Sequence, residues 1–388
     1  NTALTTLYCD NNQLTDLDVS ANTSLTHLEC ANNQLTSLDV SNNTALTSLD
    51  CYSNQLTSLD ISNNTALTTL YCNNNQLIHL NMKNGITDGL TNFDATGNSL
   101  TCIEVNADEI AYATANWTHA NGNIDDGVAF SVVCSPEGYT YVPDNNFEQA
   151  LIDLDYDDTL DDFVLTANIS GVTSLNVSSK SISDLTGIED FDALSNLYCY
   201  DNQLTNLDLG SNLELTMLHS TYNQLTSIDV SSYTLLTQLY LDNNQLTSLD
   251  VNNNTALTNL SCHVNELTSL DVSSNTALTY LSCSINSSAG LDVSNNTALT
   301  YLSCRINQLT SLDVSANTAL AYLNCFNNQL TDLDVSNNTA LMELDCDNNQ
   351  LTYLNMRNGV TDALTTFDAT NNDSLKCIES LNPDYATA

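Results

Sequence analysis

The sequence predicts a mainly β solenoid with two parallel sheets of short strands, and three observations support this fold class. A unit of 21 residues recurs along most of the 388-residue chain, as the stretch NQLTSLDVSNNTALTSLDC at 33–51 illustrates. Each unit holds two copies of the phrase L-x-x-L-x-(apolar)-x-x-N. The 10 or 11 residues of each copy leave no room for a helix beside a strand and a corner.

Within each copy, inward apolar residues alternate with outward residues. Leu7 and Cys9 flank Tyr8, which is the period of a strand with one buried face. The Asn that closes each copy suits a corner because its side chain can bond the backbone of the turn and of the next coil. We therefore expect one flattened coil per unit, stacked on the next around inward Leu, Val and Cys.

One inward position carries cysteine in ten coils. These cysteines are Cys9, Cys30, Cys51, Cys72, Cys199, Cys262, Cys283, Cys304, Cys325 and Cys346. A buried thiol behaves as a small hydrophobe, and this ladder has neither a C-x-x-C spacing nor a His beside it in the core. The pattern favours an inert structural ladder over a metal or redox site.

The phrase LTSLDVSNNTALTSLDC at 35–51 resembles the 21-residue IRREKO class of bacterial leucine-rich repeats. The segment 172–194 is similar to a 22-residue internalin-type repeat. Residues 144–152, DNNFEQALI, resemble the helical N-terminal cap of secreted bacterial proteins that use type IX export. The resemblance covers nearly the whole chain and implies a leucine-rich repeat solenoid at an extracellular or cell-surface location. It also implies recognition or adhesion, without naming a ligand.

Two arrays end in the same way, at 81–104 and 355–379, where a two-residue insertion precedes a last coil. We therefore predict two domains, residues 1–134 and residues 135–388. The first is the C-terminal part of an array whose cap spans about 81–134. Its opening NTAL is a mid-repeat phrase, so we expect a window of a longer protein. The second domain consists of a helical N-terminal cap at 135–171, a solenoid at 172–354 and a truncated C-terminal cap at 355–388.

The remaining cysteines belong to the caps. Cys102 and Cys134 flank the rest of the first cap, which holds the only Trp, and we predict that they form a disulfide. By analogy, Cys377 should pair with a cysteine beyond Ala388. Such bonds imply an oxidising, exported setting.

The charge balance excludes two classes of partner. With 47 acidic residues against 5 Lys and Arg, the formal net charge is -42. Nucleic acid and anionic lipid surfaces repel such a chain. No apolar run approaches the roughly 20 residues needed to cross a bilayer, so membrane insertion is not expected either. The remaining partners are proteins, polysaccharides or copies of the chain itself.

One outward column is aspartate in both arrays. Its members are Asp18, Asp39, Asp60, Asp208, Asp229, Asp250, Asp271, Asp292, Asp313 and Asp334. Either hydrogen bonds from flanking Ser and Thr with diffuse counterions, or calcium or sodium shared between coils, could offset their repulsion. We favour hydrogen bonds, because one column supplies few of the roughly 6 to 8 oxygens that calcium takes. The column ends at Asn81 and Asn355, where Lys83 and Arg357 follow as expected electrostatic terminators.

A second possible calcium site lies in the acidic run DLDYDDTLDD at 153–162. Asp153, Asp155 and Asp157 match the first three ligand positions of an EF-hand loop. Asp158 stands where that loop needs Gly, and Val164 where it needs Glu. A solvated acidic turn is therefore favoured over a calcium site.

The face that carries the cysteine-bearing arms varies from coil to coil, whereas the opposite face repeats Ser, Asp and Ser. Variation confined to one face is typical of a recognition surface on a scaffold. The candidate ligand-binding residues are Tyr198, Tyr200, Tyr240, His263, Tyr280, Tyr301, Arg305, Tyr322 and Phe326. A stacking ladder that only stabilises neighbouring coils is the alternative for the three tyrosines at 280, 301 and 322.

These patterns predict a non-enzymatic extracellular recognition or adhesion module that binds protein or polysaccharide through the tyrosine-bearing sheet. The alternative is a structural segment of a long surface fibre built from capped arrays. We expect no enzyme, because the sequence lacks G-x-S-x-G, H-E-x-x-H and a phosphate-cradling Gly loop, and its five histidines are scattered.

Overall fold

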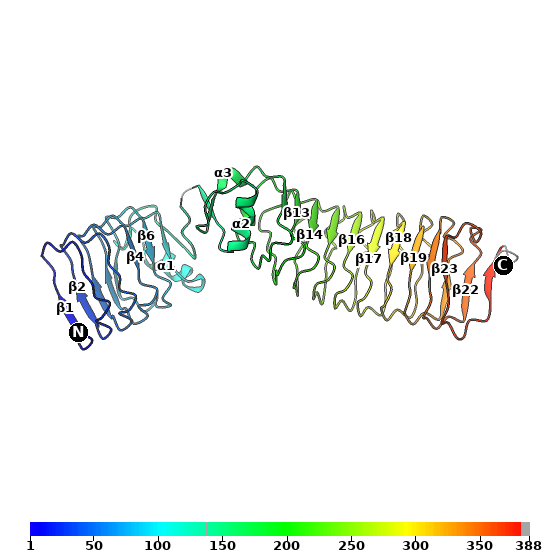
Figure 1. Ribbon diagram of the computed structural model, residues 1–388, viewed down its shortest axis with the longest axis horizontal. Helices are drawn as coiled ribbons and strands as arrows, with labels where there is room; N and C mark the ends of the chain where they lie inside the picture. Colours follow the sequence, from blue (N-terminus) through cyan, green and yellow to red (C-terminus); the bar gives the residue numbers. More distant parts are fainter. Residues whose placement is uncertain (137, 382–388) are drawn as a thin grey trace. The chain divides into compact units, whose positions relative to one another are not determined.

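The computed structural model describes residues 1–136 and 138–381 (Figure 1). The chain forms two compact units, Asn1–Pro136 and Glu137–Ala388. Each unit is a stack of coils in which short strands of successive coils lie side by side and pair in parallel. The predicted mainly β solenoid is therefore confirmed. No helix in the described ranges is long and apolar enough to cross a membrane.

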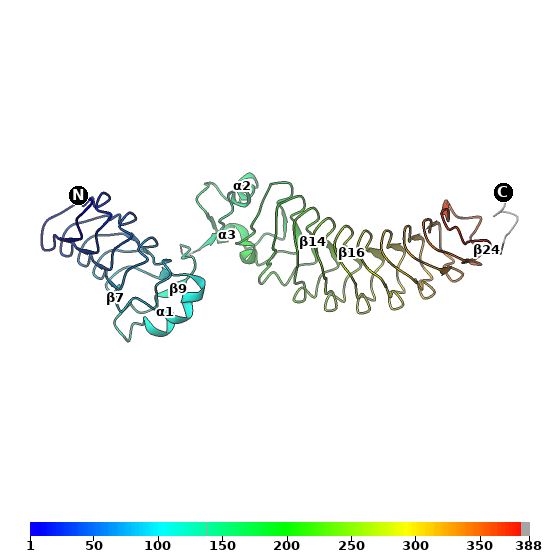
Figure 2. The same cartoon turned by 90° about the horizontal axis from the view of Figure 1, so that it is seen from below.

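The first unit carries a five-stranded sheet on its cysteine side and a four-stranded sheet on the other. The five strands are β1 (Thr6–Tyr8), β2 (His27–Glu29), β3 (Ser48–Asp50), β5 (Thr69–Tyr71) and β7 (Asn92–Asp94). The other four are β4 (Ser58–Asp60), β6 (His79–Asn81), β8 (Cys102–Glu104) and β9 (Ala129–Ser131). A short 3-10 helix η1 (Ala107–Glu109) leads into α1 (Ile110–Asn116), which packs beside β9 (Figure 2).

The second unit begins with the antiparallel pair β10 (Tyr139–Tyr141) and β11 (Phe163–Leu165), with the helices α2 (Asn145–Asp153) and α3 (Thr166–Ile169). A 3-10 helix, η2 (Ile188–Asp190), lies in the first coil. The ten strands of its main sheet are β12 (Ser174–Asn176), β13 (Asn196–Tyr198), β14 (Met217–His219), β15 (Gln238–Tyr240), β16 (Asn259–Ser261), β17 (Tyr280–Ser282), β18 (Tyr301–Ser303), β19 (Tyr322–Asn324), β21 (Glu343–Asp345) and β23 (Thr366–Asp368).

The sheet on the aspartate side is shorter than the sequence suggests. In the second unit it has three strands, β20 (Asp332–Asp334), β22 (Tyr353–Met356) and β24 (Ile378–Ser380), all in the last coils. Earlier arms on this side run extended without pairing as strands. Their Thr, Ser and Asp residues are exposed, so water can take the backbone groups that would otherwise need a partner strand.

The core is the inward row of Leu, Val and Cys. Leu281, Leu302 and Cys304 are fully buried. Burial raises the pKa of the Cys304 thiol well above its usual value and that of Cys283 to about 12, so the inward thiols stay protonated. The predicted inert ladder therefore has its sulfurs inside, where a thiolate would be costly.

Two ladders of buried asparagine tie the coils together. At the first corner, the Asn54 Nδ2 donates to the carbonyls of Cys30 and Cys51, both at 3.1 Å, and its Oδ1 accepts from the Leu35 N–H at 3.0 Å. At the second corner, the Asn296 Nδ2 donates to the carbonyls of Val272 and Asn275, both at 2.9 Å. Each coil thus supplies side-chain donors to backbone acceptors of its neighbour, as expected for the recurring Asn.

The ends of the arrays are closed by specific contacts. Cys102 and Cys134 form the predicted disulfide, with Cα atoms 5.6 Å apart. In the same unit, the centroid of the Trp117 ring lies 4.5 Å from that of the Phe93 ring. In the second unit, Asp144 caps the N-terminus of α2, because its Oδ1 accepts from the Phe147 N–H at 3.1 Å.

Candidate functional site

The most varied surface is the solvent-facing side of the ten-stranded sheet in the second unit. Each strand directs its middle Leu inward and its first and third residues outward, so Tyr280 and Ser282 flank the buried Leu281. The residue after each core Cys shares this side, as the 2.8 Å contact between the Ser284 and Ser303 hydroxyls shows. By these positions, all nine predicted ligand-binding residues lie on one face. Their ring contacts fall into two groups.

The first group, here called the aromatic cluster, consists of Tyr198, His219 and Tyr240 on strands β13 to β15, together with Tyr200, which follows β13. The His219 ring is central, with centroids 4.7 Å from Tyr200, 5.3 Å from Tyr240 and 6.2 Å from Tyr198. Burial lowers the pKa of His219, so the imidazole is neutral at pH 7. Its Nε2 lies 3.0 Å from the Thr221 hydroxyl. The cluster is therefore an uncharged aromatic surface with polar atoms at its edge.

The second group, the tyrosine stack, consists of Tyr280, Tyr301 and Tyr322 on strands β17 to β19. Their rings are nearly parallel, at 11° and 5°, with centroids 4.3 and 4.2 Å apart. Burial, followed by the neighbouring phenols, raises the pKa of Tyr301 strongly. The adjacent outward residues Ser282 and Ser303 are buried. The inner faces of the stacked rings therefore cover one another, and only part of each side chain is exposed.

The other predicted residues lie along the column that follows the core cysteines. His263 adjoins Asp242, whose carboxylate accepts from the His263 N–H at 2.9 Å and from the Ser261 hydroxyl at 2.6 Å. Phe326 is half-buried. Arg305 is exposed, and no ion pair involves it in the described part of the chain.

A hollow adjoins the aromatic cluster. It has a volume of about 510 Å³ and is lined by Tyr200, Asp201, His219, Thr221 and Tyr222. Tyr222, which sequence reasoning missed, is 61% exposed and has a φ of 53°, at a corner position where Asn is the commonest residue. The signal was available in the repeat, because most coils have a small or short polar residue (Asn, Asp, Ser or Gly) at this corner.

Three further residues at the same corner position also escaped sequence reasoning. Val264, Ile285 and Ile306 follow His263, Ser284 and Arg305 in three successive coils. They stand where Asn11, Asn32 and Asn243 stand elsewhere. We call these three residues the apolar row.

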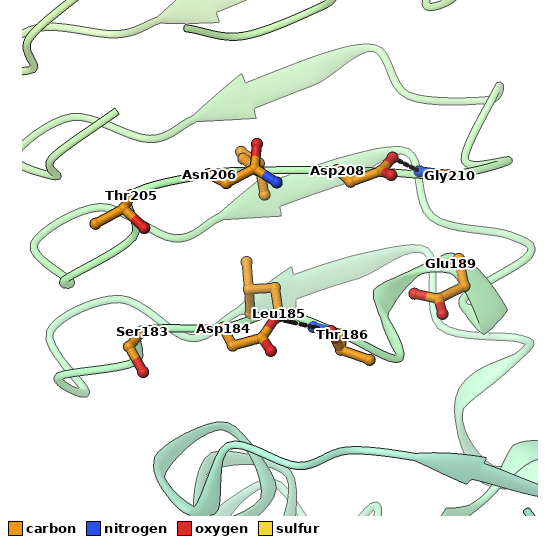
Figure 3. A pocket seen from close by; sticks show the side chains of 10 residues that line it. Ser183, Asp184, Leu185, Thr186, Glu189, Thr205, Asn206, Asp208 and Gly210 are labelled. Atoms are coloured by element: carbon orange, nitrogen blue, oxygen red, sulfur yellow. Dashed lines mark hydrogen bonds between the residues drawn. The ribbon is translucent and has the colours of Figure 1, made fainter. Parts of the chain in front are cut away.

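A second hollow, of about 630 Å³, lies on the aspartate side of the first coils of the second unit (Figure 3). Its walls hold carboxylates that already have local partners. Asp184 accepts from the Thr186 N–H and Asp208 from the Gly210 N–H, both at 2.9 Å. No aromatic side chain lines it. This hollow offers solvated polar walls and lacks the varied rings of the opposite face.

The aspartate column is held by local hydrogen bonds. In coil after coil, one carboxylate oxygen accepts from the N–H two residues further on, as Asp313 does from Ser315 at 2.9 Å. The Ser315 hydroxyl and N–H lower the pKa of Asp313. At the end of the column, the Asn355 amide donates to Asp334 at 3.0 Å. The favoured hydrogen-bonded arrangement is therefore present, and ions in the outer solvent layer remain a prediction.

The basic residues expected to end the column pair instead with the next coil. Lys83 lies 3.1 Å from Glu104, and Arg357 lies 3.2 Å from Glu379. In both units, the column therefore ends on an Asn that bonds the last Asp, with a neighbouring cation held by a Glu of the cap.

The acidic run does not assemble its three predicted ligands. Asp153 binds the Lys180 ammonium at 2.7 Å, and Asp155 lies at a turn with a φ of 60°. One carboxylate oxygen each of Asp157 and Glu148 is buried without a hydrogen bond. Within the described ranges, no three His, Cys, Asp or Glu side chains are grouped to hold a metal ion. The solvated acidic turn stays the favoured prediction for this loop, with calcium binding as its alternative.

The fold and this one-sided surface define a class of protein, a repeat solenoid that presents a varied sheet to solvent on an invariant scaffold. The family model described as Leucine Rich repeats (2 copies) matches residues 2–43. The same phrase recurs in the coils of both units. The chain belongs to the leucine-rich repeat proteins.

Three of the solved structures with similar chains come from bacteria. The functional domain of InlJ from Listeria monocytogenes, described as including a cysteine ladder, is 32% identical over 92% of this chain and 70% of its own, with a TM-score of 0.47. A leucine-rich repeat protein of Leptospira interrogans is 22% identical over 90% of this chain and 86% of its own, with a TM-score of 0.48. The internalin InlF of Listeria monocytogenes is 19% identical over 97% of this chain and 87% of its own, with a TM-score of 0.40. The comparison with curated sequences finds no match.

Proposed function

We propose that this chain is a non-enzymatic recognition module that binds a protein or polysaccharide outside the cell through the ten-stranded sheet of the second unit. One observation carries the proposal. Aromatic, apolar and cationic side chains gather on this face, whereas the opposite face repeats exposed Thr, Ser and Asp. Both faces are built on the same pattern of inward Leu residues, so the solenoid fold does not require their outward residues to differ. The difference therefore suggests a function for the varied face.

The chemistry of both faces favours binding over catalysis. Members of the aspartate column are engaged by the residue two positions on, so they form a repeated scaffold and no carboxylate pair with contrasting environments. The one imidazole within the aromatic cluster, His219, contacts rings and the Thr221 hydroxyl. The aromatic rings on this face are half-exposed, apart from the exposed Tyr222, and such rings suit a binding surface.

The test is a pair of binding screens on the intact chain, one on a glycan array and one on a displayed random-peptide library. We expect ligands from at least one screen, with binding weakened by the substitutions Tyr200→Ser and Tyr222→Ser on the aromatic hollow. Thr268→Ala and Thr310→Ala are matched controls, since both side chains are exposed on the opposite face.

The competing function is a structural segment of a surface fibre. Analytical ultracentrifugation distinguishes it from the proposal. A chain that finds no ligand in either screen and associates with itself, end to end or laterally, would overturn recognition in favour of the fibre. A monomer that binds a selected ligand supports recognition.

A further inference from the structure

We infer that the apolar row, together with Arg305, is the anchor of the recognition surface, and that its occupant is an extended segment of a partner protein carrying apolar side chains and a carboxylate. The inference rests on the proposed function and narrows it from protein or polysaccharide to one class of partner.

The first support is that the apolar row breaks a conformational rule in three successive coils. Val264, Ile285 and Ile306 have φ values of 55°, 52° and 51°. Asn tolerates this left-handed conformation, whereas a β-branched side chain is strained in it. Strain of this kind persists where the surroundings impose it and often accompanies function. Three successive exceptions therefore call for an explanation.

The fold does not provide that explanation. The Ile285 N–H donates to the Arg305 carbonyl at 2.9 Å, and the Asn243 N–H makes the equivalent bond to the His263 carbonyl at 2.9 Å. An Asn thus holds the coil equally well. The row also lies outside the hydrophobic core of the unit, and none of its members is among the partly buried residues packed against that core. Its side chains are half-exposed. The three side chains therefore bury little apolar surface, and this burial does not offset the strain of their backbone conformation.

The second support is an unpaired cation in an acidic molecule. Arg305 is one of only five Lys and Arg residues against 47 acidic ones. Its carbonyl receives the Ile285 N–H, and it directly precedes Ile306, so its position adjoins two members of the row. Lys83, Lys180 and Arg357 each contact a carboxylate, but Arg305 contacts none in the described ranges. A carboxylate on the partner would complement this charge, and the planar guanidinium suits it.

The neighbouring tyrosine stack favours a peptide over a glycan in this region. Sugars bind aromatic residues through the ring faces, and the inner faces here are covered at centroid distances of 4.2 and 4.3 Å. The hydroxyls of Ser282 and Ser303, which could bond sugar hydroxyls, are buried. Branched apolar side chains beside an arginine instead match the side chains of a peptide.

The test uses the backbone strain of the apolar row to separate a loss of binding from a loss of stability. In a triple variant with Val264→Asn, Ile285→Asn and Ile306→Asn, each corner receives the residue that the repeat prefers. We expect its melting temperature to equal or exceed that of the wild-type chain, so that a loss of binding cannot come from unfolding. The probe is a peptide selected on the wild-type chain from the displayed library. Its affinity should fall at least ~10-fold, as for a binding hot spot.

Arg305→Gln should weaken the same peptide and reduce the salt dependence of its binding, while Arg305→Lys should retain part of both. The matched control is Asn243→Ser, which changes the equivalent corner one coil away and should leave affinity unchanged. Selected peptides should share an Asp or Glu next to an apolar residue.

Four results would overturn the inference. The triple Asn variant could bind the peptide as tightly as the wild-type chain, or melt at a lower temperature. The peptide could lose binding only with the Tyr200 and Tyr222 substitutions, in which case the proposed function stands and this inference fails. The row could instead mediate self-association that the triple variant abolishes, which would make a second copy its occupant. If neither screen yields a ligand, the proposed function itself fails.

Discussion

At the scale of single residues, the solenoid depends on polar side chains that act on backbone atoms. Most Asn residues in the buried ladders donate to two or more carbonyls, and the Asp residues of the exposed column accept from the N–H of the residue two positions on. Both side chains therefore replace the hydrogen bonds that longer strands would provide. This explains why Asn and Asp recur at the corners and in the exposed column of each repeat.

The buried Asn ladder gives the first prediction. Replacing Asn296 by Ala should destabilise the second unit by about 2 kcal/mol, because the carbonyls of Val272 and Asn275 lose their donors inside the protein. Urea unfolding followed by circular dichroism measures the change. The control is Asn295→Ala, since Asn295 is exposed and makes one bond, to the Ser273 carbonyl at 3.2 Å. Equal effects of the two substitutions would contradict the role of the ladder.

The aspartate column gives a prediction about acid. Hydrogen bonds from Ser273, Ser294 and Ser315 lower the pKa values of the carboxyls two residues before them. A folded-state pKa below the unfolded value means that the stabilisation is present above the usual Asp pKa of about 3.9 and is lost as the pH falls through the lowered value. Replacing these three serines by Ala should move the acid-unfolding midpoint of the second unit to higher pH.

A pH titration followed by circular dichroism measures that midpoint. Ser269→Ala is the matched control, because Ser269 is exposed on the same side and makes no hydrogen bond in the described structure. An unchanged midpoint in the triple Ser variant would show that the serine hydroxyls add no stability beyond the bonds from the backbone N–H groups.

At the scale of elements, the stack of coils was predictable from the sequence and the surface details were not. The inward positions of Leu281 and Cys304 follow from strict periodicity, and the disulfide between Cys102 and Cys134 follows from their placement in one cap. Most arms on the aspartate side do not form strands, because water can satisfy their exposed backbone groups. The repeated sequence pattern does not reveal this solvent exposure. Val264 was overlooked because an apolar residue at this corner looks like ordinary sequence variation of the repeat. Only its φ of 55° shows that the backbone conformation there disfavours a β-branched residue.

The cap of the first unit gives a prediction at this scale. The disulfide closes a loop across a sequence separation of 32 residues, which restricts the unfolded chain. Replacing Cys102 and Cys134 together by Ala should lower the free energy of unfolding of the first unit by about 3 kcal/mol. Chemical unfolding of the double variant measures this. The control is Cys377→Ala, since Cys377 is a free, exposed thiol. A change below about 0.5 kcal/mol in the double variant would mean that Trp117 and its neighbours hold the cap alone.

At the scale of the whole molecule, the chain is two cores in sequence. The buried residues from Val19 to Ile124 form one hydrophobic cluster, and those from Val142 to Met356 form another. The first is closed by the disulfide-bonded cap, and the second begins with its own capped helix α2. The stability of a solenoid is the sum of the stabilities of its coils and of the interfaces between neighbouring coils. Because the two stacks share no coil, each unit has a stability of its own.

This separation predicts that the two units unfold independently. Differential scanning calorimetry of the chain should show two transitions, and residues 138–388 alone should reproduce one of them, because no coil is shared and each core is complete without the other. Reducing agent should move only the transition that the fragment lacks, since Cys102 and Cys134 both belong to the first unit. A single cooperative transition, or a fragment whose transition differs from both of those in the full chain, would show that the two stacks share stabilising contacts. The recognition surface would then depend on the first unit as well as on its own coils.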